Sequence, residues 1–353
     1  MGWKTKAKSP MTLRSAPVVA WTGAQLLVAG GIVDPIHSHR RTPNAAAFDA
    51  ATGQWRVLSD PPNTVPLTGS AFWSGQETLV WRRDWSDATT CGLAYDLRAD
   101  EWRHLPPAPI TTTRTVAALV HGLLFVWDLT AGGAESDGRS SGGACYDSRT
   151  DRWTEVAAVP LAPRVYAGAV SNHNQVFVWG GMLDDGTTAS DGAVYEADEN
   201  VWVPAPAAPS RGRYNPGLAS SGREFIVWAG LHRPKVRGRE IAPRDGAAYD
   251  PSSGTWRPLT AAPRGASSPY IAPVGGELVT WGGAREFERN AYVLGYDPLS
   301  DSWRAIPDEG STPTSGCPGV WTGDELLVWI RMDSSHDLWS YAPAATSHGR
   351  DTS

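Results

Sequence analysis

The chain has 353 residues, a formal net charge of −6 and a hydrophobic fraction of 41%, which is ample for a large core. The negative charge argues against general attraction to nucleic acid or to anionic membrane surfaces. No stretch approaches the roughly 18 consecutive apolar residues that cross a bilayer. The first ten residues lack the apolar segment of a secretory signal, so we expect a cytoplasmic protein that binds neither nucleic acid nor membrane.

An aromatic residue, usually followed by an acid, recurs along the chain with Trp seven positions later. Turn-forming residues between the two rings predict a strand, a tight turn and a second strand. The 18 tryptophans and 37 glycines of the chain fit many such short strands around repeated aromatic packing sites. The six copies are Phe48 to Trp55, Tyr95 to Trp102, Tyr146 to Trp153, Tyr195 to Trp202, Tyr249 to Trp256 and Tyr296 to Trp303.

A short apolar run recurs in step with the aromatic pairs and ends in an aromatic residue or a glycine pair. Such runs, bounded by turn signals, predict buried strands. Each run follows another short strand and a polar hairpin, so every unit supplies four strands, which is one propeller blade. The seven runs are residues 25–31, 78–83, 123–128, 175–181, 224–230, 277–283 and 325–331.

The two ends of the chain each hold part of one repeat. Tyr341 occupies the aromatic position of the last unit, but no Trp strand follows it, whereas Trp3 stands alone at the start. Counting Trp3, the repeat averages about fifty residues, which is the spacing of a propeller array. The sequence predicts an all-β fold: a seven-bladed β-propeller of four-stranded antiparallel blades over residues 1–343. An N-terminal strand at Trp3 completes the last blade, and a disordered tail follows at 344–353.

This period, with paired glycines, then Tyr-Asp, then Trp, resembles the kelch repeat over nearly the whole chain. Residues 30–31, 180–181 and 282–283 match the glycine pair, residues 229–230 match half of it, and residues 82–83, 128–129 and 330–331 depart from it. The resemblance implies a galactose-oxidase-like propeller architecture, with aromatic rings that pack between blades. Kelch propellers include copper oxidases, sugar epimerases, iron-assisted specifier proteins and peptide-binding adaptors, so the resemblance implies the fold and leaves the activity open.

The three cysteines and the basic residues give further information about the chain. Cys91 and Cys145 fall just before repeat tyrosines and Cys317 starts an inner strand, so none is placed for the thioether-linked copper site of the oxidases. We expect reduced, buried thiols. Positive charge is almost entirely arginine, which is typical of a GC-rich bacterial genome.

The long, charged loops are expected on one face of the ring, around the central channel, where rigid propellers present variable loops for binding. Converging arginines there suit a carboxylate, phosphate or enolate ligand. The alternative is that these arginines pair with neighbouring acids and only support the fold. The candidate ligand-binding residues are Arg14, Arg114, Arg164, Arg213 and Arg264, which precede inner strands, with Arg83, Arg331 and Trp85 from the other loops.

General acid–base catalysis needs one acid, Tyr or His beside the substrate. The candidates on this face are Asp34, His37, Glu286, Asp333, Tyr166 and Tyr214, and Tyr270 is expected on the same face. We predict no cofactor. If a divalent metal is bound, His37, His39, Asp333 and His336 are its candidate ligands, because imidazole and carboxylate groups at short spacing hold zinc or iron.

Two functions remain open at this point. The first is a small-molecule-binding propeller, a non-redox enzyme of the isomerase, epimerase, cyclase or lyase type that acts on an anionic or polar biosynthetic substrate at the channel mouth. The second is a scaffold that binds an acidic peptide or partner enzyme on the same face, for which the basic segment 233–240 is suited. A concave cavity at the mouth favours the first, and a flat or plugged mouth favours the second.

Overall fold

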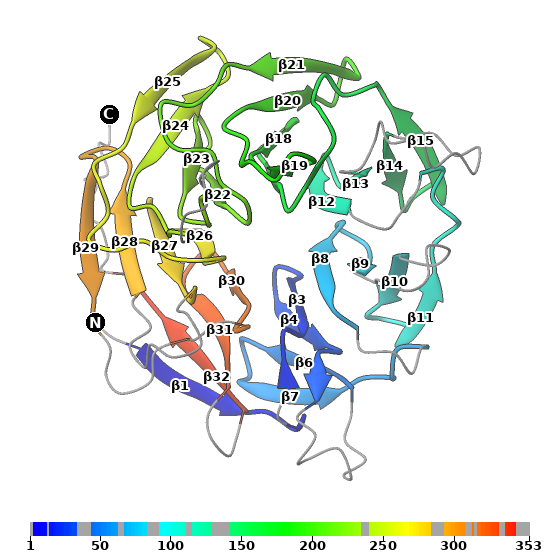
Figure 1. Ribbon diagram of the computed structural model, residues 1–353. Helices are drawn as coiled ribbons and strands as arrows, with labels where there is room; N and C mark the ends of the chain where they lie inside the picture. Colours follow the sequence, from blue (N-terminus) through cyan, green and yellow to red (C-terminus); the bar gives the residue numbers. More distant parts are fainter. Residues whose placement is uncertain are drawn as a thin grey trace, which may run out of the picture.

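The structure is a computed structural model that describes residues 3–12, 14–33, 44–62, 67–82, 92–110, 115–128, 142–233, 240–283, 293–307, 313, 316–331 and 336–343. At residues 331, 336 and 337 it describes only the backbone. Seven four-stranded antiparallel sheets stand in a ring around a central channel (Figure 1). This arrangement confirms the predicted seven-bladed β-propeller.

Each blade runs from an inner strand at the channel to an outer strand at the rim. The first three blades are β3 (Val18–Trp21), β4 (Gln25–Ala29), β6 (Ala45–Asp49) and β7 (Gln54–Val57); β8 (Gly69–Trp73), β9 (Thr78–Arg82), β10 (Gly92–Asp96) and β11 (Glu101–His104); and β12 (Thr115–Val120), β13 (Leu123–Asp128), β14 (Gly143–Asp147) and β15 (Arg152–Val156). The next two are β17 (Gly168–Ser171), β18 (Gln175–Trp179), β20 (Gly192–Glu196) and β21 (Val201–Ala205); and β22 (Gly217–Ser220), β23 (Phe225–Trp228), β24 (Gly246–Asp250) and β25 (Thr255–Pro258). The sixth is β26 (Tyr270–Val274), β27 (Glu277–Trp281), β28 (Val293–Asp297) and β29 (Ser302–Ile306).

The seventh blade joins the two ends of the chain. Its strands β30 (Gly319–Trp321), β31 (Leu326–Arg331) and β32 (His336–Tyr341) come from the C-terminal end, and β1 (Trp3–Lys8) adds the outer strand. Trp3 lies directly opposite Tyr341 in the antiparallel register of β1 and β32. The predicted closure is therefore confirmed, and main-chain hydrogen bonds hold the ring shut.

The repeated aromatic pairs hold the two outer strands of each blade together. All six predicted pairs, together with Trp3 and Tyr341, lie opposite each other in register, with ring centroids 4.7 to 5.5 Å apart. In five blades the indole nitrogen also donates to a carbonyl oxygen of the preceding blade, as in the 2.9 Å bond from Trp102 to Ser59. These rings therefore support the blades and their packing, as the repeat predicted.

The glycine pairs mark where a buried second strand ends. Gly180 and Gly181 both have positive φ, of 73° and 103°, which turns the chain sharply after β18. In the blades that lack the pair, the second strand continues through Arg82, Asp128 or Arg331. After the turn, the chain makes short two-stranded pairings with the segment that enters the inner strand: β2 (Arg14–Ser15) with β5 (Ile32–Val33), and β16 (Arg164–Val165) with β19 (Met182–Leu183).

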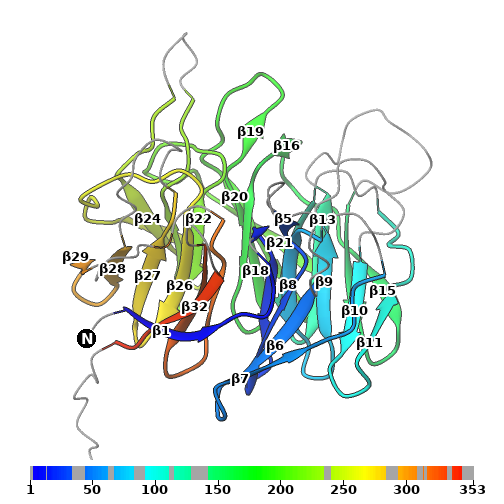
Figure 2. The same cartoon turned by 90° about the horizontal axis from the view of Figure 1, so that it is seen from below.

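The two faces of the ring differ. Tight hairpin turns lie at one end of the strands, whereas β16 and β19 rise above the other end (Figure 2). The loops entering the inner strands and those following the apolar runs share this second face, which we call the upper face. In the described part of the chain, we find no helix that is long and apolar enough to cross a membrane.

Candidate functional site

A concave pocket of about 370 Å³ lies at the upper mouth of the central channel. The starts of the inner strands β8, β12, β17 and β26 line it, together with the residues just before β17, β22 and β26 and the end of β9. Each blade contributes only a few residues, and sequence neighbours in the site are about fifty residues apart. The site is thus a product of the ring, and it lies where the sequence predicted a binding site.

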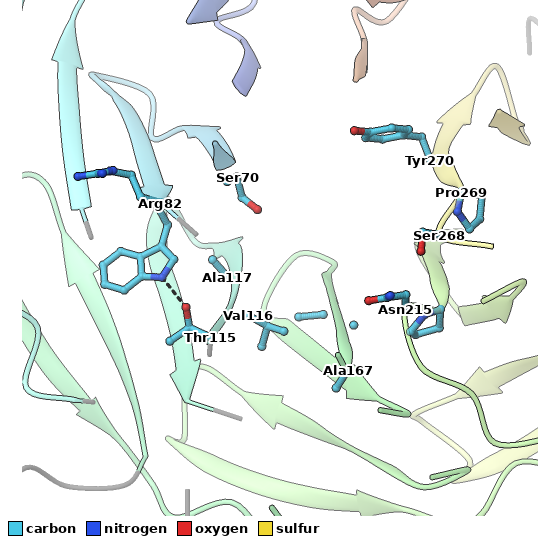
Figure 3. Close-up of a pocket in the computed structure, with 15 residues that line it drawn as sticks. Ser70, Arg82, Thr115, Val116, Ala117, Ala167, Asn215, Ser268, Pro269 and Tyr270 are labelled. Atoms are coloured by element: carbon cyan, nitrogen blue, oxygen red, sulfur yellow. Dashed lines mark hydrogen bonds between the residues drawn. The ribbon is translucent and has the colours of Figure 1, made fainter. Parts of the chain in front are cut away.

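The pocket wall offers neutral hydrogen-bonding groups. The side chains of Ser70, Asn215 and Tyr270 extend toward the open space, whereas the guanidinium group of Arg82 points away from it (Figure 3). Arg82 is also only 5% exposed. Hydroxyl and amide groups of this kind both donate and accept hydrogen bonds, so they can orient a polar ligand without requiring a charge on it.

Two aromatic side chains stiffen opposite walls of the pocket. Trp81 donates its indole N–H to the hydroxyl group of Thr115 in the next blade, at 2.7 Å. The ring of Tyr270 stacks on Trp281, with centroids 5.7 Å apart and an interplanar angle of 13°. Because both rings are held by their neighbours, the wall is preorganised for a ligand, which lowers the entropic cost of binding.

A left-handed residue precedes the inner strand in several blades. Tyr166 (φ 60°), Asn215 (φ 46°) and Ser268 (φ 49°) all have this conformation, as does Ala16 (φ 49°). The backbone N–H of Asn215 donates to the carbonyl oxygen of Tyr166 at 2.8 Å, so neighbouring blades are hydrogen-bonded at the mouth. Such conformations cost energy for residues other than glycine and are concentrated at ligand sites.

Three of the predicted ligand arginines are buried supports. Arg14, Arg164 and Arg213 are at most 1% exposed. Each donates a hydrogen bond to the backbone carbonyl oxygen of the residue that begins a left-handed turn. Arg14 donates to Gly30, Arg164 to Gly180 and Arg213 to Ala229. The prediction that they aim at a ligand is therefore wrong, because their donors are directed at the protein backbone.

Acidic side chains pair with two of these arginines, which agrees with the alternative interpretation that the arginines pair with neighbouring acids. Arg164 forms a salt bridge with Asp191 at 2.9 Å, and Arg213 forms one with Asp245 at 3.2 Å. Burial lowers the pKa of the Arg14 guanidinium to about 10 and also lowers the pKa of Arg213. Both remain charged at neutral pH, and the hydrogen bonds to backbone carbonyls offset part of the cost of burying that charge.

Sequence spacing distinguishes the buried arginines from the others. Arg14, Arg164 and Arg213 stand fifteen residues before the last residue of the following apolar strand. Arg264 stands seventeen residues before Trp281 and is exposed, and the half-buried Ala266 takes the equivalent position in its blade. The sequence prediction treated the spacings of fifteen and seventeen residues as equivalent. A shift of two residues, however, places the side chain at a different position of the segment that enters the inner strand.

Two predicted catalytic tyrosines lie on the rim of the pocket. Tyr166 and Tyr214 are in ring contact, with centroids 6.0 Å apart, and the residues that follow them, Ala167 and Asn215, line the pocket. Tyr214 donates a hydrogen bond to Glu240, and burial together with this carboxylate raises the pKa of Tyr214 to about 12. The structure thus brings these two candidates together at the mouth.

The other candidates lie outside the residues that the structure describes. These are Asp34, His37, His39, Arg83, Trp85, Arg114, Glu286 and Asp333, while Arg331 and His336 are described only by their backbone in β31 and β32. Among the described side chains, no group of three or more His, Cys, Asp or Glu residues is arranged to hold a metal ion.

A larger hollow of about 780 Å³ lies at the hairpin face, between the second and third blades. Three of its charged groups are paired with one another, because Arg103 bonds both Glu77 and Asp151. Similar Glu–Arg–Tyr contacts recur at Glu224, Arg257 and Tyr296, and at Glu277, Arg304 and Tyr341. This repetition indicates a support between blades, so the channel mouth is the better candidate site.

The side chains of Cys145 and Cys317 are buried thiols. Burial raises the pKa of the Cys145 thiol to about 12, so it stays protonated at neutral pH.

Comparison with known proteins points to one type of repeat. No family model matches the chain. It is 27% identical over 184 residues to the Kelch-like protein terF of Aspergillus terreus, 29% identical over 153 residues to the human Kelch-like protein 34, and 27% identical over 142 residues to the Kelch repeat and BTB domain-containing protein 8 of Danio rerio. The matches cover 48%, 40% and 36% of this chain, but only 39%, 23% and 23% of the relatives.

Solved structures share the same architecture. The structure of YjhT matches with a TM-score of 0.60 at 13% identity, over 84% of this chain and 99% of that one. A fungal alcohol oxidase of the AA5 family, in complex with copper, matches with a TM-score of 0.67 at 14% identity, over 96% of this chain and 75% of that one. At this level of identity the likeness shows the fold alone.

Proposed function

Because the chain is a kelch-repeat β-propeller, we propose that it binds a small anionic or polar molecule in the channel-mouth pocket and acts on it as a non-redox enzyme. The reaction class is an isomerisation, epimerisation, cyclisation or elimination. The observation that supports this proposal is the concave pocket itself, formed by five successive blades at their inner, upper ends. A pocket of this size encloses a small molecule and removes it from bulk water.

Tyr270 is the described residue best placed to move a proton. Its ring is held against Trp281 and its hydroxyl group extends into the pocket (Figure 3). A tyrosine hydroxyl acts as a general acid or base when the substrate lies within hydrogen-bond reach. Ser70 and Asn215, on facing walls, would orient the polar groups of the substrate.

The test uses two variants. One blocks the channel-mouth pocket, and the other blocks the hollow of the hairpin face. Ser70→Trp places a large ring in the channel mouth, and Ser148→Trp places the same ring in the hollow of the hairpin face. Ligands found by a fragment screen against the wild-type protein, using ligand-observed NMR, should lose binding to Ser70→Trp and keep it with Ser148→Trp. Unchanged binding to Ser70→Trp, with a folded protein by circular dichroism, contradicts the proposed site.

A second function, peptide binding on the same face, is favoured by one specific feature. Arg211, Arg233, Arg244 and Arg264 are exposed on loops of the fifth and sixth blades at the upper face. Exposed guanidinium groups donate charge-assisted hydrogen bonds to the carboxylates of an acidic peptide. Fluorescence anisotropy with an oligo-glutamate peptide tests this function: binding should weaken in Arg233→Ala and Arg264→Ala, and it should persist in Ser70→Trp if the peptide does not use the pocket.

A divalent metal is the remaining alternative for the chemistry. The candidate ligands that the sequence suggests, His37, His39, Asp333 and His336, lie outside the described side chains. Elemental analysis of the purified protein by mass spectrometry decides between metal-assisted and purely acid–base catalysis. One equivalent of zinc or iron that is lost in His37→Ala would favour the metal.

A further inference from the structure

Tyr166 holds a bulky side chain in a conformation that bulky residues avoid. At the corresponding positions of other blades stand Ala16, Asn215, Ser268 and Gly316, all small or, for asparagine, tolerant of positive φ. Tyr166 has a φ of 60°, and the β-carbon of any L-residue is crowded in this region. A smaller residue would therefore satisfy the backbone at lower cost.

Burial of the ring is only partial. Tyr166 is 36% exposed, which makes it one of the few large apolar side chains that the described surface presents to solvent. Strained residues are concentrated at ligand sites. The exposed part of this ring is available for contact with a ligand.

Tyr214 supplies a second ring beside it. The two rings lie 6.0 Å apart with an interplanar angle of 48°. Tyr214 is held by its hydrogen bond to Glu240 and by a pair of backbone hydrogen bonds with Leu231, both of 2.9 Å. One fixed ring and one exposed ring together form a surface that we call the aromatic lip, defined by Tyr166 and Tyr214.

The aromatic lip adjoins the pocket through the residues that follow its two tyrosines. Ala167 and Asn215, the next residues along each segment, line the pocket. On the other side, His232 pairs with Ile241, which is 38% exposed, next to Leu231. A ligand whose polar end lies among Ser70, Asn215 and Tyr270 would therefore place the rest of its structure against the lip.

We propose that the ligand of the channel mouth carries an aromatic or flat apolar group, which packs on the lip formed by Tyr166 and Tyr214 while its polar end occupies the pocket. This inference rests on the proposed function and adds the class of ligand to it. Aromatic rings pack favourably against one another in tilted or offset arrangements, beyond the effect of the area that they bury.

The test uses fragment pairs in which the same polar group is carried on a phenyl ring or on a methyl group. Mandelamide and lactamide are a neutral pair, and mandelate and lactate are an anionic pair. In NMR titrations the phenyl member of a binding pair should bind the wild-type protein at least about tenfold more tightly than the methyl member. Tyr166→Asn, which introduces the residue found at position 215, should reduce this preference by roughly 3- to 10-fold.

Two further measurements separate the possible failures. Tyr166→Asn should raise the melting temperature, because it relieves the left-handed strain, whereas loss of stability would indicate a structural role and overturn the inference. Ser268→Ala, at the polar wall, should weaken both members of a pair alike. Equal binding of phenyl and methyl members, still lost in Ser70→Trp, overturns the inference and leaves the proposed function intact. Binding that Ser70→Trp does not affect overturns both.

Discussion

Trp3 lies opposite Tyr341, with ring centroids 5.5 Å apart, in the pair of strands that joins the two ends of the chain. The pair repeats the geometry that Tyr296 and Trp303 have within a single blade, where the centroids are 4.8 Å apart. The closing contact is thus the same local contact as in every other blade, made by residues 338 positions apart. Because Trp3 is 2% exposed, its side chain belongs to the core of the seventh blade.

We predict that Trp3→Ala lowers the free energy of unfolding by about 3 to 5 kcal/mol, since it removes a buried aromatic side chain. Urea unfolding followed by tryptophan fluorescence measures this change. Lys4→Ala, on the exposed side of the same strand, is the control and should change stability by less than about 0.5 kcal/mol. Similar values for the two variants would show that the N-terminal strand does not close the ring.

The buried arginines are predicted to act on stability and not on ligand binding. Arg213→Met removes the hydrogen bonds to Ala229 and Asp245 and should cost about 3 kcal/mol or more, because it breaks a buried charged network. Arg264→Met, at an exposed arginine two residues away from the equivalent position, should cost less than about 0.5 kcal/mol. Weaker ligand binding in a fully folded Arg213→Met protein would contradict this prediction, because it would show that Arg213 contacts the ligand.

The glycine pair of the fourth blade allows two effects of a substitution to be separated. One is the contact of a new β-carbon with neighbouring atoms, and the other is the strain of a positive φ. Gly180 and Gly186 have similar φ values, of 73° and 77°. A β-carbon at Gly180 would meet the carbonyl oxygen of Arg213 at 2.7 Å, whereas a β-carbon at Gly186 would meet nothing within 4 Å. Gly186→Ala should therefore cost about 1 kcal/mol, the conformational penalty alone. Gly180→Ala should cost clearly more, and equal melting temperatures for the two variants would contradict the close contact.

The tyrosine–aspartate contacts on the hairpin face predict a pH dependence. The hydrogen bond from Tyr146 lowers the pKa of Asp151. A folded-state pKa below the unfolded value stabilises the folded protein above about pH 4, and this stabilisation is lost as the pH falls through the folded-state pKa. Asp151→Asn should reduce the loss of stability between pH 5 and about pH 2, although only slightly, because the carboxylate is largely exposed.

The fourth blade shows that this substitution is compatible with the fold. Asn200 occupies the same place there and accepts a hydrogen bond from Tyr195 at 3.0 Å. Asn200→Asp is therefore the reciprocal variant, and it should add acid sensitivity. Urea midpoints at pH 3 and pH 7 for both variants check the sign of the effect.

The sequence by itself determined the repeat, the number of strands in each blade and the place of closure. The pairing of Tyr95 with Trp102 follows from a seven-residue spacing across one turn, and the position of Trp3 follows from a period of about fifty. Such features are local or periodic, so a single chain displays them directly.

Only the tertiary structure decided which polar residues are available for function. Whether Arg164 reaches a ligand or the carbonyl oxygen of Gly180 depends on how the entry segment of a blade lies against the turn that ends its second strand. The pocket joins Ser70 to Tyr270, residues that belong to blades four places apart in the chain. Neighbouring relations of this kind arise because the ring brings the starts of the inner strands to one opening, and no spacing along the sequence records which side chains then face the solvent.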